Sequence, residues 1–310
     1  MNNKNNNIMK RRISIFRISY LLFFLMTGMA SCQMPILDEE DIVSEKDANI
    51  ILHFVQYETS PLSPLQEARG TRSATGITEI CSRLNIALFD AEGTKVKTVA
   101  QKEGDASYGT VALSLAAGTY RLVVIAHNCD GSATITSTEK VTFPNNKVTD
   151  TFYYYGDLVV GAEKQSYDLT LTRAVAMFRL VMTDASIPAS VAKLKFYYLG
   201  GSSTFSPKDG YGCVQSKQTE IRPVAADGIY EIYTLPHTEE DVLTKLTVTA
   251  LDANDNIIKE RIFENVPVIR NQVTRYKGNF FGSGGGGETG SSDFRLTADP
   301  DWDSVNGYTF

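Results

Sequence analysis

Apolar residues recur at every second position in short runs along most of this chain, and this period constrains the fold more than any other feature. The run that holds Leu84, Ile86 and Leu88 is one example. Side chains alternate between the two faces of a β-strand, so a period of two predicts strands with a buried face. Beyond the first 31 residues, no segment of 12 residues shows a convincing 3.6-residue period. The sequence therefore predicts an all-β protein.

Turn signals separate these runs at intervals of about 8 to 12 residues, a spacing typical of β-sandwiches. Residues 90–93 predict a hairpin turn in which Gly93 takes a positive φ. A second hairpin is predicted about residues 117–118, and the nearly unbroken apolar strand after it is expected to be covered on both faces. Residues 252–256 begin with the alternation of a calcium loop but lack its glycine and distal glutamate, which favours a polar hairpin turn.

The N-terminal residues have the features of a bacterial export signal. A positive stretch at residues 10–12 precedes an apolar core at residues 20–29, which is too short to span a bilayer. Ala30 and Ser31 stand directly before Cys32, as lipoprotein processing requires, and this predicts acylation of the Cys32 thiol. Each buried methylene contributes about 0.8 kcal/mol, so two or three acyl chains would hold the protein on a membrane. An ordinary cleaved signal with a chance cysteine is the alternative.

The strands after the signal fall into two blocks that meet near residues 157–166, so two tandem β-sandwich domains are expected. The run GSGGGGETGSS has too much backbone freedom to pack and predicts a tether. Strand character returns after it, and that terminal strand either completes its own sheet, which is favoured, or reaches another molecule. The predicted organisation is a lipoprotein signal peptide at 1–31, an acidic tether at 32–48, an N-terminal sandwich at 49–160, a C-terminal sandwich at 161–281, and a Gly-rich linker with a terminal strand at 282–310.

The mature chain is acidic. The signal holds five of the 30 Lys and Arg residues and none of the 36 Asp and Glu residues, which leaves a net charge of about −11. Nucleic-acid binding depends on a basic surface, so no nucleic-acid partner is expected. The acidic run at residues 38–41 resembles the surface-export signals of some Gram-negative lipoproteins.

Three cysteines follow Cys32, namely Cys81, Cys129 and Cys213, and none has the CxxC spacing of a zinc or redox site. An odd number cannot all pair within the chain. A Cys81–Cys129 disulfide and three free thiols both stay open.

Catalytic chemistry has little support in this sequence. The three histidines, His53, His127 and His237, lie in or beside strands without metal-ligand spacing, and satisfied or exposed histidines are the expected reading. No catalytic residue, metal site or cofactor is therefore predicted. Tyrosine and phenylalanine are plentiful, 15 of each, and exposed aromatic side chains could bind glycans, although at least half of those within strands should face the core.

The chain resembles the fimbrillin superfamily of Bacteroidales-type bacteria over about residues 30–281. The resemblance lies in the order of a lipobox, a strand, a loop with Arg69 and Arg72, and the segments LNIALFDAEGTKV, AAGTYRLVVIAHN, LTRAVAMFRLVMTDASIP, YEIYTLP and RNQVTRYKGNFF. It implies two tandem transthyretin-like (Greek-key) β-sandwich domains. Met29 in the lipobox and the Gly-rich tether depart from the family pattern.

The resemblance also implies a function without catalysis. It implies a lipid-anchored fimbrial anchor or minor subunit that assembles by β-strand exchange at the outer membrane and supports adhesion.

 In stalk subunits of the family, a protease cuts after an arginine in the loop that follows the first strand, the strand leaves, and a strand from a neighbouring subunit takes its place. Arg69 and Arg72 occupy that loop here. An anchor is expected to stay uncut, because cleavage would part the lipid on Cys32 from both sandwiches.

The expected partners are the outer membrane, through the lipid on Cys32, other fimbrial subunits, and a host or bacterial surface ligand. The expected location is the outer membrane, at the cell surface within a fimbrium. Three alternatives stay open: a polymerising stalk fimbrillin that is processed after Arg69 or Arg72, a glycan-binding surface lipoprotein, and a hydrolase. The hydrolase is the weakest, since the sequence shows no triad or metal-ligand set. Solvated surface charge is the other reading of the two arginines.

Overall fold

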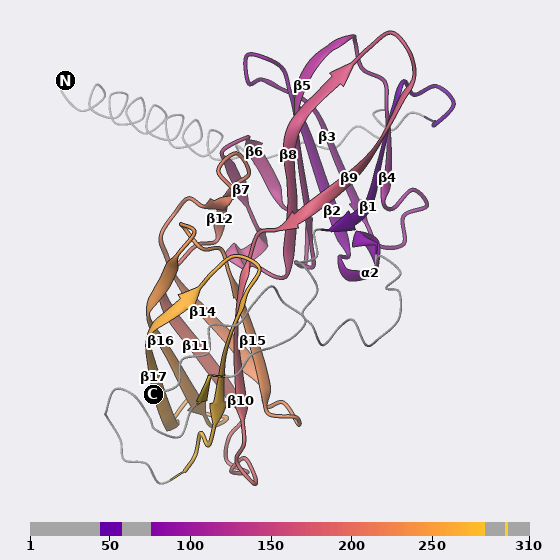
Figure 1. Cartoon of the computed structure of the whole chain (residues 1–310). Helices are drawn as coiled ribbons and strands as arrows, with labels where there is room; N and C mark the ends of the chain where they lie inside the picture. The colour runs from indigo at the N-terminus through magenta and orange to yellow at the C-terminus, as the bar shows by residue number, and fades with distance from the viewer. Residues whose placement is uncertain (1–43, 58–75, 283–294, 297–310) are drawn as a thin grey trace, which may run out of the picture. The chain divides into compact units, whose positions relative to one another are not determined.

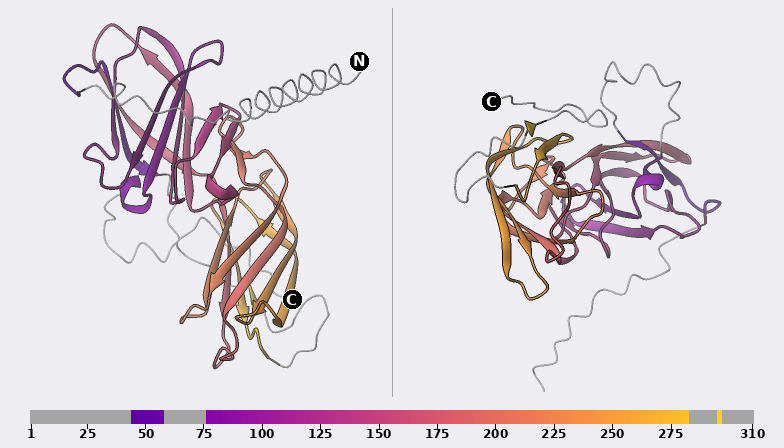
Figure 2. Two further views of the ribbon diagram at one scale, coloured as in Figure 1. Left: turned by 180° about the vertical axis from the view of Figure 1, so that it is seen from behind. Right: turned by 90° about the horizontal axis from the view of Figure 1, so that it is seen from below.

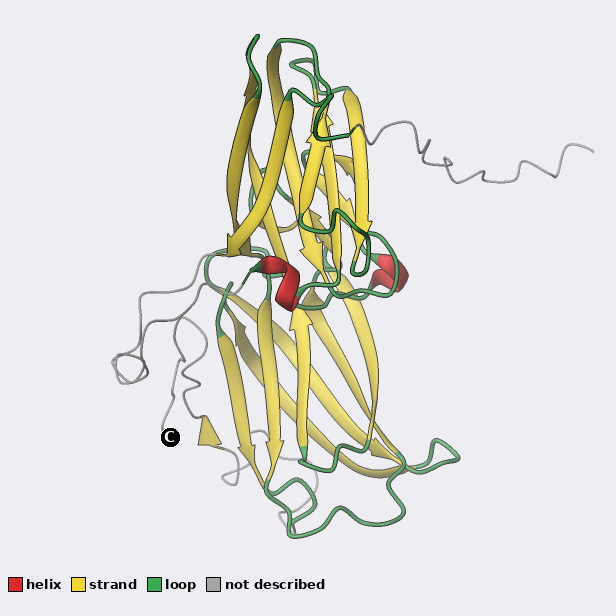
Figure 3. Cartoon of the chain, turned by 90° about the vertical axis from the view of Figure 1, so that its right-hand side faces the viewer, coloured by secondary structure: helices red, strands yellow, loops and turns green. Residues whose placement is uncertain are grey.

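The computed structural model describes residues 44–57, 76–282 and 295–296, which belong to one compact unit of the chain (Figures 1 and 3). Their regular secondary structure is almost entirely β-strand, and the predicted all-β sandwich fold is confirmed. The helical turns among them are α2 (Ile77–Ile80) and the 3₁₀ turn η2 (Pro144–Asn146). Neither is long enough to cross a bilayer, and no other described segment is helical.

The largest sheet has seven strands and folds over at one corner, so that it supplies both layers of a sandwich. In spatial order its strands are β3 (Lys95–Lys102), β2 (Arg83–Phe89), β5 (Gly118–His127), β8 (Thr151–Val160), β9 (Gln165–Arg173), β1 (Ile50–Tyr57) and β4 (Thr110–Leu113). At the corner, β8 and β9 pair through Phe152 with Arg173 and through Tyr153 with Thr172. Strand β9 then runs parallel to β1 in the other layer (Figure 1).

Both layers bury alternate side chains in one hydrophobic cluster. Ile86 of β2 and Val124 of β5 are directly opposite each other and are fully buried in it. Val123 and Ile125 are equally buried, but they pack in a different cluster against the other face of the sheet. The prediction that β5 is covered on both faces is therefore confirmed.

Two four-stranded sheets pack face to face farther along the chain (Figure 2). The first contains, in spatial order, β15 (Ile229–Thr234), β10 (Ala176–Met182), β18 (Val273–Gly278) and β19 (Arg295–Leu296). The second contains β14 (Ser216–Pro223), β11 (Lys193–Gly201), β16 (Asp241–Leu251) and β17 (Ile257–Val268). Between the sheets, the ring of Phe178 lies 6.5 Å from that of Phe196 and 5.7 Å from that of Phe263, centroid to centroid.

A fourth sheet, which the sequence did not predict, covers the outer face of β2 and β5. Its strands, in spatial order, are β13 (Tyr211–Gly212), β12 (Thr204–Ser206), β7 (Lys140–Thr142) and β6 (Thr134–Ser137). Phe205 of β12 is fully buried in the cluster that this sheet forms with β2 and β5, and its ring lies 4.8 Å from that of Tyr153. These short strands join segments that are far apart in the sequence.

The predicted turns have mixed outcomes. Gly93 has a φ of +80°, as predicted. The side chain of Asp252 accepts hydrogen bonds from the backbone N–H groups of Asn254 and Asn256, both at 2.8 Å, so the predicted polar turn is confirmed. The hairpin predicted about residues 117–118 is wrong. β4 pairs with β1, while β2 and β8 occupy both edges of β5, so the chain crosses between layers there.

The division into two domains at residue 161 stays a prediction. β9, which follows that position, pairs with β1 and β8 in the seven-stranded sheet. We therefore propose that a division between the two sandwiches falls after Arg173, where the chain enters β10.

Candidate strand-exchange site

Strand β1 lies between β9 and β4 in the seven-stranded sheet and not at its edge, and the slot that it fills between these two strands is its groove. It is antiparallel to β4, with Ile50 opposite Leu113, and parallel to β9, with Ile50 opposite Gln165. The side chains of Ile50, Leu52 and Phe54 are 0–2% exposed and pack in the cluster enclosed by the sheet. Taking β1 away would leave a gap with backbone hydrogen-bonding groups on both sides and an apolar floor.

The sequence of β1 suits this position. The strand IILHFVQY is rich in β-branched and aromatic residues, which favour extended backbone. Ile51 and His53 are partly exposed between the three buried side chains, so inward and outward positions alternate. The register shifts between Phe54 and Gln56, where a bulge interrupts the pairing with β9.

Asn49 fixes the start of β1. Its side-chain amide donates to the carbonyl of Leu115 at 2.8 Å, and its side-chain oxygen accepts from the N–H of Leu115 at 2.9 Å. Its backbone N–H donates to the carbonyl of Leu113, and its carbonyl accepts from the N–H of Gln165. These bonds tie the strand to both neighbours at the point where it enters the groove.

Burial of the three inward side chains contributes about 1.5–3 kcal/mol each, or about 5–9 kcal/mol together. Such a contribution is a large share of the 5–15 kcal/mol by which folded domains are usually stable. A strand from another chain could replace it only if it carried apolar side chains at alternate positions. The groove therefore has the features that strand addition requires.

The predicted functional residues lie outside the described part of the chain. Cys32 precedes it, and Arg69 and Arg72 fall between β1, which ends at Tyr57, and α2, which begins at Ile77. Because both arginines lie between β1 and the next strand in the sequence, a cut at either one would leave β1 in the sheet without a covalent link to the strands that follow it. The acylation and processing of these residues stay predictions.

His127 is a buried structural residue. Its Nε2 donates to the side-chain oxygen of Asn85 at 2.8 Å, and its Nδ1 accepts from the backbone N–H of Cys129 at 3.0 Å. Burial, with a smaller contribution from the charge of Arg83, lowers the pKa of His127 to about 4. The ring is therefore neutral at physiological pH, and it links the end of β5 to β2.

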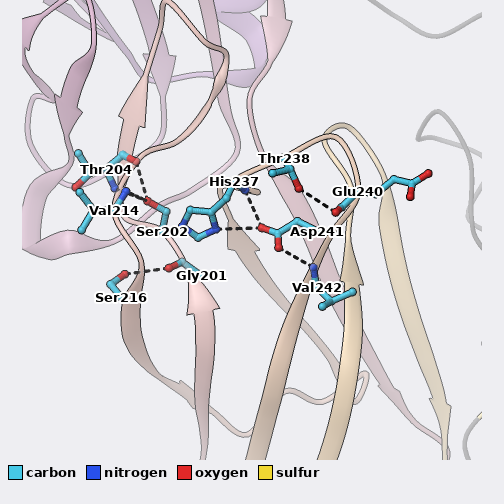
Figure 4. A network of polar contacts seen from close by, with 10 residues as sticks. All are labelled: Gly201, Ser202, Thr204, Val214, Ser216, His237, Thr238, Glu240, Asp241 and Val242. Atoms are coloured by element: carbon cyan, nitrogen blue, oxygen red, sulfur yellow. Dashed lines mark hydrogen bonds and ion pairs between the residues drawn. The ribbon is translucent and has the colours of Figure 1, made fainter.

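His237 and Asp241 lie close to Ser202, which invites comparison with a hydrolase triad (Figure 4). His237 Nδ1 lies 3.0 Å from the carboxylate of Asp241. Ser202, which is 2% exposed, donates to the carbonyl of Thr204 at 2.7 Å. Nε2 of His237 has no hydrogen-bond partner in the described part of the chain. The hydroxyl of Ser202 is thus hydrogen-bonded to the backbone and not to His237. These contacts order the loops that precede β12 and β16.

The other candidates for chemistry have structural surroundings. His53 lies 3.3 Å from the hydroxyl of Thr110 on the neighbouring strand. Among the described residues, no group of His, Cys, Asp and Glu side chains has the arrangement of a metal site. Cys81 and Cys129 are buried free thiols, whose pKa values burial raises, and Cys213 is an exposed free thiol.

The terminal strand returns to its own sheet in this structure. Arg295 and Leu296 form β19, antiparallel to β18, with Leu296 opposite Tyr276 and Arg295 opposite Lys277. The fold-back that the sequence favoured is present for these two residues.

Comparison with solved structures gives the same fold. A crystal structure of a candidate adhesin from Bacteroides ovatus matches with a TM-score of 0.50 at 11% identity, over 84% of this chain and 95% of that chain. A candidate polysaccharide-binding protein from Bacteroides thetaiotaomicron matches with a TM-score of 0.49 at 10% identity, over 74% and 90%. The fimbrial anchor protein Mfa2 from Porphyromonas gingivalis matches with a TM-score of 0.42 at 11% identity, over 84% and 99%.

The Bacteroides ovatus structure confirms, for the fold, the resemblance that the sequence indicated, and fimbrial proteins are among the matches. No curated protein matches the chain. A family model does match it, over residues 55–306, and its description is a family of unknown function. That match spans most of the chain, which therefore belongs to this family of unknown function, DUF6562.

Proposed function

We propose that the chain is a non-enzymatic, lipid-anchored fimbrial protein, an anchor or minor subunit that joins its neighbours by β-strand exchange. Acyl chains on Cys32 hold it at the outer membrane, and other fimbrial subunits are its partners. The fimbrial role of Mfa2, a protein of the same fold class, accords with the proposal without deciding it.

The position of β1 is the observation that carries this proposal. The strand has neighbours on both sides, buries alternate side chains, and is followed by a loop with two arginines. A groove of this kind gains backbone hydrogen bonds and apolar burial from any strand that fits its register. In the intact chain β1 fills its own groove, so the protein cannot accept a foreign strand there.

The proposal of an anchor or minor subunit requires that the loop after β1 stays intact. An intact loop keeps the lipid on Cys32 covalently joined to the sheets, and a cut loop would leave only the non-covalent hold of β1. A stalk subunit instead needs a cut loop, because β1 must leave the groove before a strand of the next subunit can enter it.

Mass spectrometry of the protein from the outer membrane of its own host tests the proposal. An acylated Cys32 on a chain that is unbroken between residues 67 and 73 is the expected result. A mature N-terminus directly after Arg69 or Arg72 would instead identify a processed stalk subunit. A Cys32 without acyl chains would reject the membrane anchor.

A further inference from the structure

Arg275, which forms no ion pair with any described carboxylate, lies on the outer face of the sheet that contains β10 and β18. Tyr276 and Phe178 face the core of that sandwich, so Arg275 and its neighbour Arg179 lie on the opposite face. Nε of Arg275 is buried and has no hydrogen-bond partner within the described ranges. Among the residues that the structure describes, no carboxylate forms an ion pair with Arg275.

The carboxylate in this row already has a partner. Arg179 is directly opposite Arg275 on β10, and it binds Glu231 of β15, with its Nε 2.8 Å from the carboxylate. The row Glu231, Arg179, Arg275 thus has one negative and two positive charges. A partly buried guanidinium is costly unless an anion pairs with it.

The register of β19 indicates where the acidic residues that follow it in the sequence would dock. β19 is antiparallel to β18, with Leu296 opposite Tyr276, so a strand that continued in this register would have position 297 opposite Arg275 and position 299 opposite Val273. Opposed residues of antiparallel strands share a face, and so do alternate residues of one strand. In that register Asp299 would share the face of Arg275, and Asp301 would follow just beyond the first residue of β18.

We propose that the face formed by Arg179 and Arg275 is a carboxylate-binding surface, and that its occupant is the chain's own acidic segment around Asp299 and Asp301. The segment docks as a continuation of β19 and supplies the counter-charge that Arg275 otherwise lacks. This inference is independent of the proposed fimbrial function, since it concerns another sheet and needs neither Cys32 nor the loop after β1.

Trp302 provides a direct probe, because it is the only tryptophan of the chain and lies within the acidic segment. Quenching of its fluorescence by acrylamide, a neutral quencher, is measured on the full mature chain. We expect less quenching in the folded chain than in urea, and more quenching in Arg275→Gln. A change of about threefold in the ratio of docked to undocked segment is the size that one partly exposed ion pair produces. Screening by added salt should act in the same direction.

Matched variants separate pairing from general destabilisation. Lys217→Gln removes an exposed positive charge on β14, in the other four-stranded sheet, and should leave the quenching unchanged. Asp299→Asn with Asp301→Asn should match Arg275→Gln, and the triple variant should show no further rise. The exchanged pair Arg275→Asp with Asp299→Arg should recover protection. Far-UV circular dichroism checks that each variant is folded.

Equal quenching in the folded wild-type chain and in Arg275→Gln would overturn the proposal. A second pair of results would also overturn it: acrylamide quenches Trp302 as strongly in the folded chain as in urea, and polygalacturonate binds the wild-type chain but not Arg275→Gln. In that case the surface would serve a foreign acidic polymer and not the chain's own segment.

Discussion

Replacement of Leu52 by alanine should weaken the sheet at the centre of β1. Leu52 is fully buried, lies between Val111 of β4 and Tyr167 of β9, and packs in the cluster that the folded-over sheet encloses. Leu→Ala changes at such sites cost about 2–5 kcal/mol, because the transfer free energy is lost and a cavity is left. With neighbours on both sides to restrict collapse, we expect about 3 kcal/mol.

Urea denaturation, followed by circular dichroism, measures this loss. At a slope of about 3 kcal/mol per molar, a loss of about 3 kcal/mol lowers the urea midpoint by about 1 M. Ile51→Ala is the matched control, since Ile51 lies on the same strand but is only partly buried, and it should shift the midpoint much less. Equal shifts for the two variants, or none for Leu52→Ala, would refute the reasoning that inward burial holds β1 in its groove.

Three further predictions concern buried polar groups and thiols. His127 has a folded-state pKa of about 4, below its ordinary value of about 6.5, so the unfolded chain takes up the proton first as the pH falls. Stability should therefore be lost as the pH falls from about 6.5 to about 4, and His127→Gln should flatten that part of the urea-midpoint profile; an unchanged profile would contradict this assignment. Arg173→Ala leaves the carboxylate of Asp150 buried without its partner and should lower the free energy of unfolding by about 3–5 kcal/mol. Arg121→Ala removes an ion pair that is well exposed and should lower it by about 1 kcal/mol or less. Similar losses of stability for both variants in thermal unfolding would argue against a buried ion pair. Cys213 is the exposed thiol among the described cysteines, so labelling of the native chain with a thiol reagent should modify it first, and the two buried thiols should react only on unfolding.

The period of two was sufficient to locate the long strands. It failed for β6, β7, β12 and β13, which have 2–4 residues each and no alternation to detect. Their stability depends on burial of side chains such as Phe205 against segments distant in the sequence. No local pattern records such a partner.

The same limit applies to pairing. The prediction of a hairpin about residues 117–118 used proximity in the sequence, but β4 instead pairs with β1, and β1 lies beside β9, more than a hundred residues later. The sequence located β1 and the loop with the arginines, whereas the groove became visible only through this long-range register. The position of Arg275 beside Arg179 likewise depends on the parallel pairing of β10 and β18.

Strand replacement in a cleaved chain tests the central claim most directly. A specific protease site is introduced in the loop between residues 58 and 75, and the mature chain is cut there, unfolded in urea, and refolded with an excess of a labelled peptide of the sequence NIILHFVQYE. The control peptide carries aspartate at the positions of Ile50, Leu52 and Phe54, whose side chains face the core. We predict that the β1 peptide is retained by the refolded protein on gel filtration and that the control peptide is not. Equal retention of both peptides, or of neither, would contradict the account of β1 as an exchangeable strand.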